Sequence, residues 1–394
     1  MGNRKLLILG GYGRAGSAIS RLLLREADVA LAIVGRHKEK AEELADQLNE
    51  EFPGSRISAL YADAAKPESL KIAFGGADMV LDCATASQHL KQIAQSALDA
   101  GADFLDIHFQ QDTLSVLREL APVVEKAGRF FITQAGCFPG LSSVMVRRTW
   151  PYFRPYKASV KSRYRKAVVG VAMNLRDENP DAVREIIGAL DDYKAEIFKE
   201  GRWQSAGYKD VVKLDFGSMF GVRSCYPIQL AEMRTLPETF GMDHVGVYVA
   251  GFNWFVDNVV FPSAMVAGKI KKNFGRDCLA KMLSWGMKTF SGSETGLVFV
   301  VEAEGEKDGR CIQLRILAEH NDAYFFNAVP VVASLLQYFD GAIVKPGLWM
   351  MGHIVDPIRL MKDIERMDII IECEVAYGDS RFRRSCGRLS TGRY

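Results

Sequence analysis

Apolar and polar residues alternate in blocks along the first 140 residues, and the blocks fit two kinds of element. Short apolar runs are typical of strands buried on both faces of a parallel sheet. Longer segments between them repeat apolar residues every three or four positions, as on one face of a helix. We expect strands at 5–10, 29–35, 56–63, 78–85, 103–107 and 129–136, and helices at 17–26, 37–52, 67–76, 88–101 and 113–128. This alternation predicts an α/β domain with a doubly wound parallel sheet over residues 1–140.

The pattern changes after Pro139 and Gly140. Strand-like runs at 157–173, 244–256, 296–305 and 310–319 outnumber the expected helices at 181–193 and 276–290, and the turn-like sequence EKDG at 306–309 predicts a hairpin between the last two runs. Residues 141–325 are therefore predicted to form a second α+β domain with a mostly antiparallel sheet. Residues 326–394 are expected to be helical up to about 375, and the Arg-rich residues 381–394 to form a loosely ordered tail.

A glycine loop follows the first strand and opens the first helix. In the spacing GxGxxG, the first Gly allows a tight turn, the second lets backbone N–H groups approach a pyrophosphate, and the third lets the helix pack closely on the strand. The positive end of the helix then faces the anion. In this context the motif predicts a Rossmann dinucleotide-binding domain whose loop contacts the cofactor through Gly10, Gly11, Tyr12, Gly13, Arg14, Ala15 and Gly16.

The end of the second strand distinguishes two forms of the cofactor. An NAD-type site carries an Asp or Glu about 20 residues after the glycines, to bind the ribose 2′-hydroxyl. This chain has Gly35 and Arg36 there, with no acid. A guanidinium can pair with a 2′-phosphate, which a carboxylate would repel. NADP(H) is therefore the predicted cofactor, bound through Gly35 and Arg36, although Arg36 could instead be a solvated surface residue.

Two further positions are candidate cofactor contacts. Asp63 follows the third strand, where a carboxylate can contact adenine or cap the helix that begins at Pro67. Cys83, Ala84 and Thr85 follow the fourth strand. Because ligands of such sheets lie beyond the carboxyl ends of the strands, we expect these small residues to run beneath the ribose and nicotinamide.

The candidate catalytic residues are Asp106, His108 and Cys137. Asp106 and His108 end the fifth strand at the same ligand edge, and His is the side chain whose unperturbed pKa lies nearest neutrality. His108 could donate a proton or anchor a substrate, or the two residues could form a structural hydrogen-bonded pair. Cys137 lies in the turn after the sixth strand, and catalysis through its thiol would need a base that the sequence does not reveal.

Composition narrows the class of protein. The chain is 48% hydrophobic and 25% charged, as ordinary globular proteins are, and its net charge of +2 argues against a nucleic-acid binder. Its apolar stretches end well before the about 18 residues that a membrane span needs, and the N-terminus lacks a signal-peptide pattern. The seven cysteines are scattered and never spaced as CxxC. This predicts neither a disulfide framework nor a metal site, and favours a reducing cytoplasm.

Basic residues gather in one segment. Between Lys126 and Asp177 there is no acidic residue. A solvated basic face or a cationic rim that attracts an anionic substrate could explain this segment, which includes Arg147, Arg148, Arg154, Lys157, Lys161, Arg163, Arg165 and Lys166.

Three separated segments together resemble the saccharopine dehydrogenase-like oxidoreductases, in particular the saccharopine reductase branch. They are GGYGRAGSAISRLL with VGRHKEKAEELA, then GADFLDI with AGCFPGLSSVM, and finally AVPVVASLLQYFDGAIVKPGLW. The resemblance implies a Rossmann domain, an α/β substrate domain and a C-terminal helix that returns to the first domain. It also implies NADP(H)-linked chemistry at a C–N bond, and often dimers.

We therefore predict an NADP(H)-dependent oxidoreductase that transfers a hydride to or from an imine or secondary amine of a small, anionic substrate, and that forms a homodimer. A protonated iminium would need no strong general acid. The first alternative is a reductase of C=C or C=O bonds in a lipid or secondary-metabolite pathway. The second is a non-catalytic protein that binds NADP(H) as a sensor.

Overall fold

The computed structural model describes residues 4–157, 161–174, 180–189, 195–271, 274–292 and 294–378. The chain divides into two compact units: unit 1 is Met1–Val144 with Tyr324–Ile364, and unit 2 is Met145–Ala323 with Glu365–Tyr394. The tail expected at 381–394 lies outside the described residues, as does Cys386. No helix in the described part of the chain is long and apolar enough to cross a lipid bilayer.

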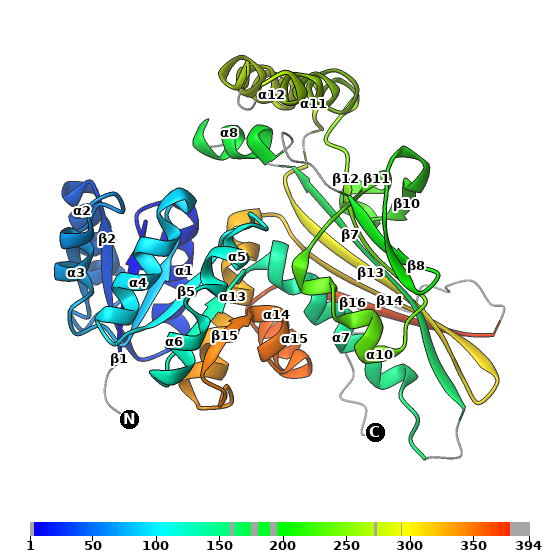
Figure 1. The fold of residues 1–394 in the computed structure, drawn as a ribbon, viewed down its shortest axis with the longest axis horizontal. Helices are drawn as coiled ribbons and strands as arrows, with labels where there is room; N and C mark the ends of the chain where they lie inside the picture. The colour runs from blue at the N-terminus through cyan, green and yellow to red at the C-terminus, as the bar shows by residue number, and fades with distance from the viewer. Residues whose placement is uncertain are drawn as a thin grey trace. The chain divides into compact units, whose positions relative to one another are not determined.

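Unit 1 contains a parallel sheet of seven strands in the order β15-β6-β5-β4-β1-β2-β3. Helices α1 to α6 flank this sheet (Figure 1), which confirms the predicted doubly wound arrangement. The strands are β1 (Arg4–Leu9), β2 (Val29–Gly35), β3 (Ile57–Tyr61), β4 (Met79–Asp82), β5 (Asp103–Asp106), β6 (Phe130–Thr133) and β15 (Gly347–Met350). The helices are α1 (Arg14–Glu26), α2 (Lys38–Glu51), α3 (Pro67–Phe74), α4 (Leu90–Asp99), α5 (Thr113–Arg118), α6 (Ala121–Lys126), α13 (Ala323–Phe339), α14 (Met351–Ile354) and α15 (Pro357–Arg366).

The central strands of this sheet are buried along their length, as their uninterrupted apolar sequences require. Leu6 to Ile8 of β1 are 0% exposed, and residues from β1, β2, β4, β5 and β6 share one apolar cluster with the inner faces of α3 and α4. The helix expected over 113–128 is instead two helices, α5 and α6. Pro122 lies in the first turn of α6, where its missing N–H costs nothing, whereas it would disrupt the interior of a single helix.

The C-terminal segment differs from the helical prediction in two places. Residues Gly347–Met350 form β15, which pairs with β6 at the edge of the first sheet, and Ile370–Tyr377 form β16, which pairs with β14 of the second sheet. Residues 326–364 thus belong to unit 1, whereas residues from 365 onward belong to unit 2. Helix α13 does return to the first domain, as the resemblance implied.

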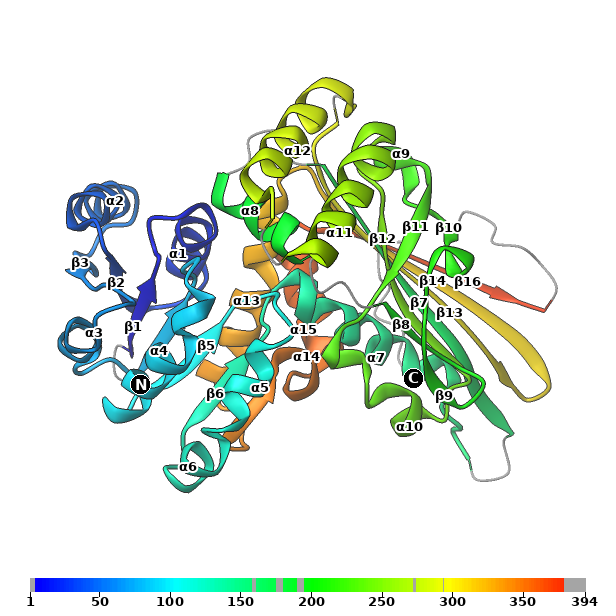
Figure 2. The same ribbon diagram turned by 45° about the horizontal axis from the view of Figure 1, so that its top comes forward.

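Unit 2 is built on a mostly antiparallel sheet in the order β10-β11-β12-β7-β13-β14-β16, to which β8 and β9 add a short hairpin. One pair, β12 with β7, is parallel. Figure 2 shows the long strands β7, β13 and β14 side by side. The strands are β7 (Ser162–Asn174), β8 (Glu196–Lys199), β9 (Arg202–Ser205), β10 (Val212–Asp215), β11 (Val222–Ile228), β12 (His244–Ala250), β13 (Gly296–Lys307), β14 (Arg310–His320) and β16.

The predicted hairpin joins β13 to β14. Asp308 and Gly309 form its two-residue turn, with φ of 53° and 72°. An Asp-Gly pair suits such a turn because both positions need positive φ.

The helices of unit 2 form a small apolar cluster of their own. α8 (Pro180–Ala189), α11 (Phe261–Ile270) and α12 (Arg276–Phe290) pack together through residues such as Val183, Ala264 and Leu283 (Figures 1 and 2). Residues 190–193 of the helix expected at 181–193 lie outside the described residues. The remaining α-helices in the described residues are α7 (Ser142–Phe153), α9 (Gly217–Phe220) and α10 (Leu236–Phe240).

Candidate functional site

The glycine loop lies at the carboxyl edge of the first sheet, between β1 and α1. Gly10 adopts φ of 75°, and a Cβ on it would lie 2.8 Å from Cα of Ala84. A Cβ on Gly16 would lie 2.6 Å from the carbonyl oxygen of Gly10. Neither position can carry a side chain without moving backbone, so the loop is held close to the end of β4 and to the first turn of α1. This is the geometry that the motif predicted.

Tyr12 closes the loop toward β2. A Cβ on Gly35 would lie 2.4 Å from Cε1 of Tyr12, so the ring packs directly on the Gly35 backbone. The Tyr12 hydroxyl accepts a hydrogen bond from the backbone N–H of His37 at 3.3 Å. Arg36 lies between Gly35 and His37, and its side chain is exposed. It forms no ion pair with any residue that the structure describes. The strand end therefore presents a guanidinium that is available to an anion.

Arg14, the first residue of α1, contacts the C-terminal part of unit 1. Its guanidinium carbon lies 5.3 Å from the centre of the Tyr324 ring on α13, a cation–π distance. Sequence patterns could not reveal this contact, because the two residues are 310 positions apart.

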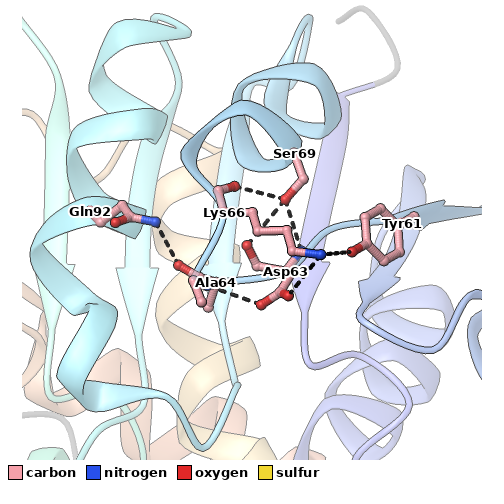
Figure 3. A network of polar contacts seen from close by, with 7 residues as sticks. Tyr61, Asp63, Ala64, Lys66, Ser69 and Gln92 are labelled. Carbon is pink, nitrogen blue, oxygen red and sulfur yellow. Dashed lines mark hydrogen bonds and ion pairs between the residues drawn. The ribbon is translucent and has the colours of Figure 1, made fainter.

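Asp63 is the centre of a polar network at the start of α3 (Figure 3). Its Oδ1 accepts a hydrogen bond from the N–H of Ala65 at 3.0 Å, and its Oδ2 lies 3.7 Å from Nζ of Lys66. The Ser69 hydroxyl oxygen accepts a hydrogen bond from the backbone N–H of Asp63 at 3.0 Å. Of the two roles considered for Asp63, these contacts support organisation of the turn before α3.

The end of β4 is brought against the glycine loop. The Cys83 N–H donates to the carbonyl of Leu9 at 2.9 Å, and Ala84 lies beside Gly10. Burial raises the pKa of the Cys83 thiol, with the nearby charges of Asp82 and Asp106 acting in the same direction. Cys83 is therefore a neutral small side chain here, in keeping with its predicted place beneath a nucleotide.

A buried Asp–His pair lies beyond the ends of β4 and β5. Oδ2 of Asp82 is 3.0 Å from Nε2 of His108, and these residues are 0% and 7% exposed. Oδ1 of Asp82 accepts the N–H of Ala84 at 3.1 Å, which fixes the carboxylate. A carboxylate bonded to one ring nitrogen orients the imidazole and stabilises its protonated form.

Asp106 stands next to this pair. It is directly opposite Asp82 in the parallel register of β4 and β5, and it is fully buried. Its Oδ1 accepts the N–H groups of His108 at 3.1 Å and Gln134 at 3.2 Å, whereas no described residue hydrogen-bonds its Oδ2. Burial raises the pKa of Asp106, and the neighbouring His108 opposes that shift. Asp106 thus holds the backbone around His108.

Sequence reasoning identified Asp106 and His108 but missed Asp82. The signal was available: Asp82 ends its strand as Asp106 ends the next, and neighbouring parallel strands place their carboxyl ends together.

Cys137 is buried in the turn after β6. Its thiol is buried and donates to the carbonyl of Phe326 at 3.2 Å, while its N–H donates to Oδ1 of Asn327 at 2.9 Å. Burial raises the pKa of this thiol well above its ordinary value. The contacts join the turn after β6 to α13, and they show no base beside the sulfur.

Three of the eight residues named in the basic segment form ion pairs. Arg163 bonds Asp243, Arg165 bonds Glu306, and Lys166 bonds Glu304 at 3.2 Å, all with acids from neighbouring parts of unit 2. For these three residues, which lie on β7, the pairs favour a solvated face.

Comparisons with known proteins agree with this geometry. Residues 6–130 match the family model of the saccharopine dehydrogenase NADP-binding domain. No curated protein sequence matches the chain. Among solved structures, apo histidine-tagged saccharopine dehydrogenase (L-Glu forming) from Saccharomyces cerevisiae is similar, with a TM-score of 0.69 and 15% identity over 95% of this chain and 100% of that one. C. glutamicum DAP dehydrogenase in complex with DAP has a TM-score of 0.46 and 14% identity over 93% and 100%.

The match over the first domain supports an NADP-dependent oxidoreductase. Residues 6–130 match the saccharopine dehydrogenase NADP-binding domain, which confirms the resemblance seen in the sequence and the predicted cofactor, NADP(H). The residues present fit the cofactor. Gly10, Gly11 and Gly13 carry no side chain, so a pyrophosphate could approach the loop backbone, and the first amides of α1 follow the loop. Arg36 is exposed and has no acid next to it in the sequence.

Proposed function

We propose that this protein catalyses NADP(H)-linked hydride transfer at a C–N bond, with an imine or iminium of a small anionic substrate as the oxidised partner. The observation that carries the proposal is the buried trio of Asp82, Asp106 and His108 at the ligand edge of the sheet. Two carboxyl groups there favour a cationic iminium, whereas they disfavour the negative charge that develops on a carbonyl oxygen during reduction.

The bound cofactor supplies the hydride. The chain's residues bind and orient: Gly10 to Gly16 would hold the pyrophosphate, Gly35 and Arg36 the 2′-phosphate, and Cys83 to Thr85 would lie beneath the ribose and nicotinamide. His108, held by Asp82, would donate the proton that converts an imine to an iminium. In the reverse direction it would accept the proton that the amine loses. Asp106 would act through His108 as a positioning residue.

The test is NADPH oxidation with matched substrates. A cyclic imine that carries a carboxylate is compared with the 2-oxo acid and the α,β-unsaturated acid of the same carbon number. We expect NADPH to be consumed with the imine and not with the other two. Consumption with the oxo acid or the unsaturated acid alone would overturn the C–N assignment. Tight NADPH binding with no turnover of any substrate would favour the sensor alternative.

A C=O reductase is the second candidate, because the Asp82–His108 pair offers the proton donor that such a reaction needs. Reduction of a preformed, permanently charged iminium separates the two. It needs no proton, so a His108→Asn variant should retain it if the C–N proposal holds. The homodimer and the cytoplasmic location remain predictions.

A further inference from the structure

A pocket of about 280 Å³ lies within unit 2, at one edge of its sheet. It is bounded by the end of β7 at Ala172–Asn174, the segment 250–254 after β12, helix α9 and the end of α12. This volume suits a small molecule.

The walls of this pocket are mostly apolar. Trp254 and Phe290 meet edge to face with ring centres 5.0 Å apart, and Met219, Phe220 and Phe252 add further apolar surface. Its polar amides are already used: Nδ2 of Asn174 donates to the carbonyl of Glu294 at 2.6 Å, and Nδ2 of Asn253 donates to the Ser291 hydroxyl at 3.0 Å. A ligand there would meet few unsatisfied polar groups on the walls.

Two charged residues line the pocket, Arg223 and Glu294. Arg223 is on β11, and Glu294 comes just before β13. The sheet order β11-β12-β7-β13 places three strand spacings between these two strands, roughly 14 Å at the usual spacing. Arg223 therefore brings a positive charge to the β11 end of the pocket lining, apart from Glu294.

Arg223 is held in place at the rim. Its Nε donates to the carbonyl of Phe220 at 2.9 Å, and its guanidinium forms no ion pair within the described part of the chain. Its positive charge acts on the carboxyl group of Asp257, which lies against Gly251 and accepts the N–H of Phe252 at 3.0 Å. The outer nitrogens of Arg223 remain able to bind a carboxylate.

We propose that this pocket binds an apolar chain or ring that carries one carboxylate, with the carboxylate at Arg223. An apolar monocarboxylate matches one cation and apolar walls. A ligand with several charged groups would leave charges against Trp254, Phe252 and Phe290 without partners.

The test uses calorimetry on the full chain with octanoate as the probe, and octanol, octylamine and succinate as comparisons. Octanoate should bind, octanol at least about tenfold more weakly, and octylamine and succinate not measurably. Arg223→Ala should weaken octanoate binding about 10- to 100-fold, as loss of a charge-assisted hydrogen bond does, and Arg223→Lys by less. Arg202→Ala, an exposed Arg on β9 outside the pocket, is the matched control and should bind like the unmodified protein.

A second variant tests the apolar wall. Trp254 is 61% exposed, so Trp254→Ala should fold, and it should weaken octanoate and octanol binding by similar factors. The site is overturned if octanoate fails to bind, if Arg223→Ala leaves its affinity unchanged, or if octanol binds equally well.

The binding test is independent of the proposed reaction. If the imine is reduced but octanoate does not bind, the pocket assignment is wrong and the C–N proposal stands. If octanoate binds through Arg223 but no imine acid is reduced, the binding site stands and the C–N proposal is wrong.

Discussion

Oδ2 of Asp82 lies 3.0 Å from Nε2 of His108, although the two residues are separated by 26 positions in the chain. Both are buried where β4 and β5 end, and Asp106 fixes the backbone of His108 from the other side. A carboxylate, an imidazole and a second carboxyl group thus share one small volume at the ligand edge of the first sheet.

The first prediction concerns this pair. Asp82→Asn and His108→Asn should each lower kcat about 100-fold or more, because the imidazole would lose either its orientation or its proton. The double variant should be no slower than His108→Asn alone, since Asp82 acts through His108. Steady-state kinetics give kcat, and fluorescence titration should show NADPH affinity within about twofold of the unmodified protein. His244→Asn on β12 of unit 2 is the control. Additive losses in the double variant would contradict the proposed relation.

The second prediction concerns cofactor choice. Arg36→Asp should weaken NADPH binding about 10- to 100-fold, because it removes a charge-assisted contact and adds a charge that repels the 2′-phosphate. NADH has no such phosphate, so its affinity should stay the same or rise. Fluorescence titration with each nucleotide measures both. Lys71→Asp, on α3, makes the same change of charge away from the glycine loop and should leave the ratio of affinities unaltered. An Arg36→Asp variant that still prefers NADPH would assign the preference to another residue.

The elements of unit 1 were predictable because each has a strong local pattern. β1 and β2 are unbroken apolar runs. The spacing of the glycines marks the turn that joins β1 to α1. β15 was not predictable in the same way: its four residues, GLWM, follow a helix and gain their strand identity from pairing with β6, more than 200 positions earlier.

The same distinction applies to the site. Asp106 and His108 stand out because they alternate at the end of one strand. Asp82 becomes part of the site only through the register of β4 with β5. In the basic segment, three residues appear to lack acidic partners when only the sequence is considered. In the fold, adjoining strands and loops supply an acid to each of Arg163, Arg165 and Lys166.

The third prediction concerns Cys137. Cys137→Ser should keep kcat within about twofold, because the hydroxyl can still donate to the Phe326 carbonyl, as the buried thiol does. Cys137→Ala should lower the free energy of unfolding by about 1 kcal/mol through the lost hydrogen bond and volume. Iodoacetamide followed by peptide mass spectrometry should modify the exposed Cys278 and Cys311 well before Cys137. Inactivation that follows the labelling of Cys137 would show that its thiol takes part in the reaction.

The fourth prediction separates two roles for Asp63. Its carboxylate organises the turn before α3, so Asp63→Ala should lower the free energy of unfolding by about 1 kcal/mol, as loss of a hydrogen bond does. NADPH affinity should remain within about twofold. Thermal denaturation and nucleotide titration measure the two effects, and the exposed Glu68→Ala on the same helix is the control. A weaker NADPH affinity without a loss of stability would point to an adenine contact instead.

The last prediction uses the carboxyl group beside the unit 2 pocket. Burial raises the pKa of Asp257 to about 6, against about 3.9 for an Asp in the unfolded chain. Between these values the folded protein holds a proton that the unfolded chain has released, so this group makes the free energy of unfolding fall as the pH rises from about 4 to about 6. The cost then persists above pH 6. Asp257 is only partly buried, and solvent screening reduces the effect to roughly 1–2 kcal/mol.

Asp257→Asn removes this titration and keeps an oxygen for the N–H of Phe252. The melting temperature of the variant should therefore rise relative to the unmodified protein as the pH increases from 4.5 to 7.5. Thermal denaturation across this range measures the difference, and the exposed Asp112→Asn controls for the removal of one negative charge. A constant difference at every pH would mean that Asp257 ionises with an ordinary pKa. In that case its carboxylate is solvated, and the wall of the pocket formed by Gly251 and Phe252 is open to water.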